Sequence, residues 1–234
     1  MAQCITIRST TEERRRMIPY DDVPMKSSEH PHILCKPVYV FSARVPSDPV
    51  LHQVIHAGFQ APYPYPEPVV PNLRRFFVFR TGTPSCDNLE EVLKRAIETT
   101  RDELISFFGW RAYTPEGPGN YIQMLKNFET TGISSFKSAP IIIIITEERR
   151  FPPVEQESLA FAVSHLWISA TFHHLGVHLI PGISYLSRRS EFFSLIHLPA
   201  GKYAVAGVAI GYPHEELQEN TESPAGEPEV YWFF

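Results

Sequence analysis

The chain has 234 residues, of which 43% are apolar and 20% charged, so it lacks the low-hydrophobicity, high-charge composition of a disordered protein. Its length suits one large domain or two small ones. The 21 Lys and Arg residues against 26 Asp and Glu give a formal net charge of −5, which provides no general basic field for phosphate backbones, and we expect no nucleic-acid partner.

Prolines divide the first third of the chain into segments. The chain has 22 prolines and 12 glycines. The prolines cluster at residues 19–49, 62–71 and 224–228, where they prevent regular helices and central strands. We expect loops or extended arms there. Between the first two clusters, residues 49–58 have apolar side chains at helical spacing and predict a short amphipathic helix.

The first predicted strand follows Pro71. Residues 75–80 are rich in aromatic and β-branched side chains, and Thr81-Gly82 closes the run as a turn. Asp87 resembles an N-cap followed by an acidic first turn, and residues 89–108 continue with apolar side chains in helical register. This pattern predicts one long helix or two abutting ones.

The middle of the chain predicts a central strand. Gly117-Pro118-Gly119 indicates a simple turn. Ala139-Pro140 then leads into five consecutive isoleucines, 141–145, and the lack of alternation is expected where both faces of a sheet are covered.

Residues 155–175 are apolar on nearly every side and predict a helix that ends at Gly176 as its C-cap. Such a helix lies inside a core or across a large subunit interface. The run falls short of the roughly 20 apolar residues that span a bilayer, so we expect no membrane partner. Residues 176–182 predict a short strand, 187–193 a polar helix or loop, and 203–210 a final strand.

The C-terminal tail combines two opposite characters. Residues 215–229 contain six glutamates and no Lys or Arg, whereas residues 230–234 are apolar and largely aromatic. Because leaving large apolar side chains in water forgoes roughly 1.5–3 kcal/mol each, we expect this terminus to dock on another surface.

The N-terminal residues and the cysteines indicate the compartment. Residues 1–16 carry charges where a secretory signal needs an apolar stretch of about 7–15 residues. The three cysteines, Cys4, Cys35 and Cys86, are scattered and form no C-x-x-C pair. A reducing compartment fits best, and we expect a cytoplasmic protein.

Few motifs carry recognisable chemistry. The histidine pairs 30/32, 52/56 and 174/178 each supply two ligands, whereas a catalytic zinc needs three, so we predict no metal site. Nucleophile elbows and glycine-rich phosphate loops are missing from the sequence. The remaining candidate is Arg14-Arg15-Arg16, whose guanidinium groups suit phosphate oxygens. The alternative is a solvated charge run that Glu12 and Glu13 balance.

Several weak motifs nevertheless occur in a characteristic order. They are the arginine cluster followed by Val23-Pro24, the Ala61-Pro62 helix end, Asn72 ahead of a strand, Ala139-Pro140, His174-Leu175-Gly176, Pro181-Gly182, Leu198-Pro199-Ala200-Gly201, and residues 208–213. In this order and spacing the chain resembles the nitroreductase family of FMN-dependent flavoproteins. The match is best between Ala139 and Pro213.

The resemblance implies an α+β fold with a mostly antiparallel central sheet flanked by helices, in an intertwined homodimer with FMN at the subunit interface. It implies a single domain, 1–234, with an extended N-terminal arm and a C-terminal tail, 214–234, that docks on the partner subunit. The activity implied is an oxidoreductase with NAD(P)H as co-substrate and a small electron-poor acceptor such as a nitroaromatic, quinone, enone or halogenated phenol. No catalytic side chain is predicted, because the flavin carries the hydride chemistry.

The same resemblance assigns cofactor-binding residues. Arg14, Arg15 and Arg16 would bind the FMN phosphate. Ala61 and Pro62 would contribute to the cofactor site, and Asn72 would lie near the isoalloxazine ring. Pro181, Gly182 and Ile183 would present backbone groups to the edge of that ring.

The chain also departs from the family pattern. Arg16 stands where the family has a serine, and Ile18 stands where it has a basic residue. The family often has a further Lys or Arg after the last strand, where this chain is acidic. That second contact to the phosphate is missing, or it comes from Arg74, Arg75, Arg188 or Arg189. A competing alignment places residues 35–41 in the motif with Lys36 as the one cation. The Tyr-Pro segment 63–68 would stack on flavin or substrate, or form a rigid wall. A divergent flavin-binding or flavin-less ligand-binding protein is therefore the alternative function.

Overall fold

The computed structural model describes residues 37–64, 73–114, 117–180, 182–214 and 231. All of its helices and strands lie between residues 34 and 219, in one compact unit. In chain order they are α1 (Asp48–Phe59), β1 (Arg74–Arg80), α2 (Pro84–Phe108), η2 (Gly109–Tyr113), α3 (Gly119–Thr131), α4 (Ser134–Ser138), β2 (Ile141–Glu148), α5 (Glu155–Phe172), β3 (Gly176–Leu179), η3 (Ile183–Arg188), α6 (Ser190–Leu195) and β4 (Tyr203–Gly211).

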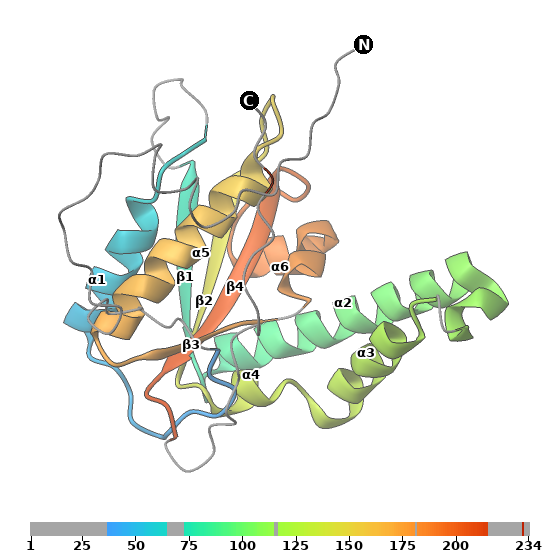
Figure 1. The fold of residues 1–234 in the computed structure, drawn as a ribbon, viewed down its shortest axis with the longest axis horizontal. Coiled ribbons are helices and arrows are strands. Elements are labelled where there is room, and N and C mark those ends of the chain that lie inside the picture. Colours follow the sequence, from blue (N-terminus) through green and yellow to red (C-terminus); the bar gives the residue numbers. More distant parts are fainter. Residues whose placement is uncertain (1–36, 65–72, 115–116, 181, 215–230, 232–234) are drawn as a thin grey trace, which may run out of the picture. The chain divides into compact units, whose positions relative to one another are not determined.

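The strands form one antiparallel sheet in the order β1-β2-β4-β3 (Figure 1). The strand predictions at residues 75–80, 141–145 and 203–210 are confirmed, and the one at 176–182 is confirmed for residues 176–179. Strand β2 is central, as predicted, since Ile143 stands opposite Val78 of β1 on one side and Val208 of β4 on the other. The α+β expectation with an antiparallel sheet flanked by helices is therefore confirmed.

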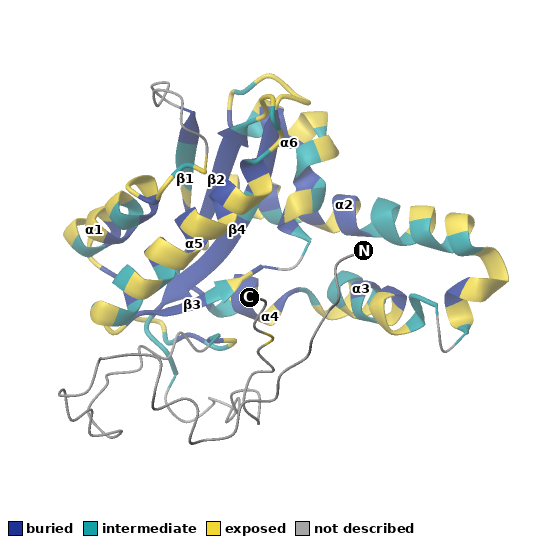
Figure 2. Cartoon of the chain, turned by 45° about the horizontal axis from the view of Figure 1, so that its top comes forward, coloured by how far each residue is buried: buried dark blue, intermediate teal, exposed yellow. Residues whose placement is uncertain are grey.

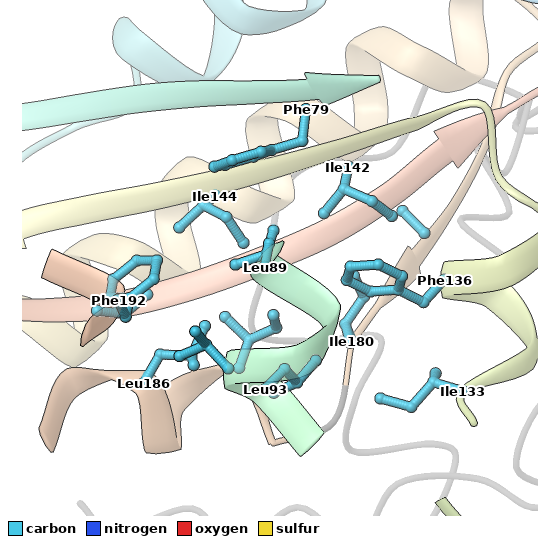
Figure 3. Packing of buried hydrophobic residues seen from close by; sticks show 14 of the residues in the cluster. Phe79, Leu89, Leu93, Ile133, Phe136, Ile142, Ile144, Ile180, Leu186 and Phe192 are labelled. Atoms are coloured by element: carbon cyan, nitrogen blue, oxygen red, sulfur yellow. The ribbon is translucent and has the colours of Figure 1, made fainter. Parts of the chain in front are cut away.

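Helices cover both faces of the sheet, which explains the unbroken isoleucine run. Ile141, Ile143 and Ile145 point to the face covered by α1 and α5. Ile142 and Ile144 point to the opposite face, where they contact residues of α2, η3 and α6 (Figure 3). All five isoleucine side chains are fully buried, as residues on a two-sided core strand should be.

Helix α2 is a single helix, and it extends beyond the sheet (Figure 1). Its buried residues run from Cys86 to Ile97, whereas its second half packs against α3. The sequence predicted only a turn at residues 117–119, and α3 and α4 were missed. Apolar side chains on α3, including the buried Ile122 and Leu125, recur at helical spacing that could have revealed it.

Two predictions of helix caps are wrong. The N-cap of α2 is Thr83 and not Asp87: the Thr83 hydroxyl accepts a hydrogen bond from the Cys86 N–H, and Asp87 lies in the first turn. Helix α5 ends at Phe172, and His174 takes the left-handed conformation expected of a C-cap glycine. Gly176 instead begins β3, where a Cβ atom would lie 2.4 Å from Val38 Cγ2.

Helix α5 lies on the sheet with an exposed outer face, so it is not enclosed by a core within one chain (Figure 2). The polar segment 187–193 is helical, in the end of η3 and the start of α6. In the described part of the chain no helix has both the length and the apolar composition to cross a bilayer. The predicted N-terminal arm and nearly all of the tail 214–234 lie outside the described residues.

Candidate functional site

Four of the nine predicted cofactor-binding residues fall in the described part of the chain. They are Ala61, Pro62, Gly182 and Ile183. The other five lie outside it: Arg14, Arg15, Arg16, Asn72 and Pro181.

Ala61 and Pro62 follow the C-terminal end of α1. The Ala61 side chain is buried, Pro62 is exposed, and the Ala61 N–H donates to the Gly58 carbonyl. The carbonyl oxygens of Gly58 and Ala61 accept hydrogen bonds from Arg74 Nη1 at 2.8 and 3.2 Å. The polypeptide at this helix end is therefore held from the sheet side by one guanidinium group.

Gly182 and Ile183 form the start of η3. Gly182 has a φ of +81°, a left-handed conformation that glycine adopts without strain, and its carbonyl accepts from the Tyr185 N–H. The Ile183 side chain is buried against Gly207 of β4. The Ile183 N–H makes only a long 3.5 Å contact with the Ile180 carbonyl, so it keeps capacity to donate to a ligand.

These two pairs lie on opposite faces of the sheet. Ala61 is bonded to Arg74, which also contacts Ser158 of α5, whereas Gly182 lies against Ile97 of α2. A ligand touching both pairs of one chain would have to pass from one face of the sheet to the other. Two chains could instead each contribute one pair to a shared site.

The sequence analysis missed a buried ionic network beside Ala61. Arg74 of β1 stands directly opposite Glu147 of β2, and its Nε donates to Glu147 Oε2 at 3.0 Å. Its Nη2 donates to the Ser158 carbonyl and hydroxyl at 3.1 and 2.7 Å, and the Ser158 hydroxyl donates to Glu147 Oε2 at 2.7 Å. Glu147 continues the face of Ile143 and Ile145, and this alternation could have revealed that it points into the core.

Burial governs the electrostatics of this network. Desolvation raises the pKa of Glu147, while hydrogen bonds from Ser158 and Arg74 oppose the rise. Glu147 Oε1 is buried and has no hydrogen-bond partner among the described residues. The Tyr63 pKa is also raised, first by burial and then by the negative charges of Glu147 and Glu155.

The network decides one alternative left open by the sequence. Arg74 uses five hydrogen bonds inside the fold, as many as a guanidinium has N–H donors, so it cannot also bind a cofactor phosphate. Arg75 lies 5.4 Å from the Tyr203 ring centre, and Arg188 is exposed with Glu103 at 3.9 Å. Arg189 differs, because its buried Nε has no acceptor within the described residues.

The histidine pair 30/32 lies outside the described residues, and within them no three His, Cys, Asp or Glu side chains come together. His52 and His56 line a cavity of about 440 Å³ between α1 and β1, together with Phe59 and Phe76. His178 instead makes a hydrogen bond of 2.6 Å between its Nδ1 and the buried Ser135 hydroxyl. The centre of its ring lies 4.6 Å from the centre of the Tyr39 ring. Burial lowers its pKa.

No family model matches the chain, and no curated protein sequence does. Solved structures do match. A nitroreductase with bound FMN from Bacteroides fragilis is 17% identical, with 84% of this chain and 94% of that chain covered at a TM-score of 0.58. An iodotyrosine deiodinase bound to FMN and 3-iodo-L-tyrosine is 18% identical, with coverage of 85% and 95% at a TM-score of 0.58.

A BluB-like flavoprotein from Clostridium difficile is 18% identical, with 82% of this chain and 91% of that chain covered at a TM-score of 0.55. Identities this low establish the fold and not the activity. The agreement extends over nearly the whole of each solved structure. The resemblance read from the sequence is thus confirmed at the level of the fold, and the chain has a nitroreductase-like fold.

Proposed function

We propose that the chain is an FMN-dependent oxidoreductase that uses NAD(P)H to reduce a small electron-poor acceptor. The observation that carries the proposal is the match of the fold, over 84% of the chain, to a nitroreductase solved with FMN. The ordered motifs that suggested this family in the sequence support it. When bound, FMN supplies the hydride chemistry, and the protein's part is to hold and orient it.

The described residues suit a flavin in two respects. Gly182 adopts a left-handed turn, and the N–H of the next residue, Ile183, makes only a long 3.5 Å contact within the chain, so it is a backbone donor for a ring edge. The buried Arg189 Nε, which lacks an acceptor in the described residues, is a donor that a cofactor oxygen would satisfy. We assign Arg14, Arg15 and Arg16 to the phosphate and Ala61, Pro62 and Asn72 to the ring.

We further propose a homodimer in which each site takes residues from two chains. Within one chain the Ala61 pair and the Gly182 pair lie on opposite faces of the sheet. The outward face of α5 bears Phe161, Ile168 and Phe172, which are 43%, 39% and 68% exposed. From residue 158 to its end the helix carries no Asp, Glu, Lys or Arg, which is the composition of a covered surface.

The acceptor class follows from the chemistry of reduced flavin, and electron-poor aromatic compounds are the first to test. Among the similar structures, one contains 3-iodo-L-tyrosine and others are nitroreductases. Nitroaromatics and halogenated phenols should therefore be compared as acceptors, with NADH and NADPH each as the electron donor.

The deciding experiment is the visible absorption spectrum of the purified protein, followed by release of any chromophore on heating. Oxidised flavin bands and released FMN are the expected result, with bleaching on addition of NADH or NADPH. A colourless protein that takes up no added FMN would contradict the proposal and leave a flavin-less binding protein of the same fold.

A further inference from the structure

The buried guanidinium of Arg74 links the end of α1 to three other elements. It comes from β1 and bonds to the carbonyl oxygens of Gly58 and Ala61, to Glu147 of β2 and to Ser158 of α5. The side chain is 7% exposed and that of Glu147 is fully buried. The pair stands between the sheet and the α1 and α5 layer, and not on the surface of the molecule.

The contacts made by Arg74 need the planar fork of an arginine. The last carbonyl groups of a helix have no partners within the helix, and they carry partial negative charge. Nη1 reaches the two carbonyl oxygens near the end of α1, while Nη2 and Nε point to Ser158 and Glu147. A lysine ammonium group on a flexible stem would not hold these acceptors in fixed directions.

Glycine 58 brings the helix end close enough for this arrangement. A Cβ atom at Gly58 would lie 3.2 Å from the Ala162 carbonyl oxygen of α5 and 3.2 Å from Phe76 Cε1 of β1. The helix end is therefore in close contact with both layers, and Arg74 bonds to its carbonyl groups from the side of the sheet. The next residues in the chain are Ala61 and Pro62, which we assigned to the flavin ring.

Stability alone does not account for the network. Buried ion pairs can often be replaced by apolar side chains of similar volume with little loss of stability, since both charges must be desolvated. Burial raises the pKa of Glu147, in the direction that desolvation of a carboxylate produces. Hydrophobic residues at positions 74 and 147 would fill the space, but they could not bond to the carbonyl groups of α1.

We propose that Arg74, held by Glu147 and Ser158, is a positioning residue that fixes the backbone of residues 58–62 so that Ala61 and Pro62 meet the flavin. This inference rests on the proposed function. Arg74 acts through the backbone and does not itself touch the cofactor, because all of its N–H donors are used within the fold.

The test compares the full-length protein with the double variant Arg74→Met, Glu147→Leu, which removes both buried charges together. The single variant Arg74→Met would leave the charge of Glu147 buried without a partner and is expected to unfold, so it is not used in the test. Arg74→Lys keeps the charge and loses the fork. Arg80→Met is the matched control, because Arg80 also joins β1 to α1, through an exposed ion pair with Asp48.

Two quantities are measured: the hydrogen-exchange rate of the backbone amides of residues 58–61, and the dissociation constant for FMN. For the folded double variant we expect both to rise at least about tenfold, with Arg74→Lys between it and the wild type. Exchange in β2 should change little in comparison. Arg80→Met should match the wild type in both measurements.

A folded double variant with wild-type exchange at residues 58–61, or with wild-type affinity for FMN, would overturn the positioning role. If the wild-type protein itself binds no FMN, the proposed function fails and the flavin part of this inference fails with it. The exchange rates then still show whether Arg74 holds the end of α1, so the two failures can be told apart.

Discussion

At the scale of single residues, burial decides which charged groups can meet a ligand. Arg74 and Arg189 are both arginines near a predicted cofactor-binding segment, yet their roles differ. Arg74 is saturated by acceptors inside the fold, whereas the buried Nε of Arg189 has none among the described residues. Counting basic residues in the sequence cannot separate the two, because the distinction depends on neighbours that are distant in the chain.

The phosphate assignment of the N-terminal arginines gives one prediction at this scale. Replacing Arg14 and Arg15 together by alanine should weaken FMN binding by more than about tenfold, since each charge-assisted hydrogen bond contributes about 1.5–3 kcal/mol. Flavin titration followed by fluorescence measures the change. An unchanged dissociation constant would remove this cluster from the site and favour the competing alignment through Lys36.

His178 gives a prediction of pH dependence. Burial lowers its pKa below the ordinary value of 6.5, so the unfolded chain binds this proton more readily than the folded protein. The contribution of neutral His178 to the free energy of unfolding should therefore be fully present above pH 6.5. Below pH 6.5 this contribution should decrease, by at most about 1.4 kcal/mol per pH unit.

Urea unfolding between about pH 7.5 and 5.5 measures this effect against His178→Asn, which keeps a polar partner for Ser135 but does not titrate. The wild type should lose more stability than the variant over this range. Equal losses in the two proteins would show that His178 is not the group responsible.

At the scale of elements, the caps of the helices were the least predictable feature. Thr83 and Asp87 are both acceptable N-cap residues, and the sequence pattern alone favoured Asp87. In the fold, the turn after β1 brings Thr83 to the helix start, where its hydroxyl also donates to the Arg80 carbonyl at 2.7 Å. The end of the preceding strand thus sets the start of α2.

Thr83→Ala should destabilise the protein by about 1 kcal/mol, because the first turn of α2 loses its side-chain acceptor. Thr83→Ser keeps the hydroxyl and should be close to the wild type. Asp87→Ala should cost about 0.5 kcal/mol through the helix dipole. Thermal or urea unfolding of the three variants checks the order, and a larger loss for Asp87→Ala than for Thr83→Ala would contradict the assigned cap.

At the scale of the whole molecule, the sheet is covered by helices on both faces, and the outward face of α5 exposes Phe161, Ile168 and Phe172 beside the uncharged or weakly basic Ser164 and His165. A second copy of the chain is the covering surface that we propose. Because the exposed side chains of this face make few contacts within one chain, charged residues placed there should disturb association more than folding.

The double variant Ile168→Glu, Phe172→Glu should accordingly sediment as single folded chains, whereas the wild type sediments as a dimer. Phe151→Glu is the control, since Phe151 is also exposed but lies outside α5. Sedimentation velocity at several protein concentrations measures the state. A monomeric wild type, or a double variant that remains dimeric, would contradict a dimer built on α5.

The sequence by itself determined the strands, the helices α1, α2 and α5, and the order of motifs that indicated the fold. Runs such as the five isoleucines have strong local preferences, and their lack of alternation directly reflects two covered faces. Helices α3 and α4 were not predicted. The sequence of α3 does contain a helical pattern, so this helix could have been predicted from the sequence.

Only the tertiary structure decided how distant residues combine. Arg74 pairs with Glu147 because the antiparallel register of β1 and β2 places them opposite each other, 73 positions apart in the chain. Likewise, the side of the sheet on which Ala61 and Gly182 lie depends on how the helices cross it, and no local pattern encodes that. Register and layer are properties of the packed sheet, and they decide which residues are available to a flavin.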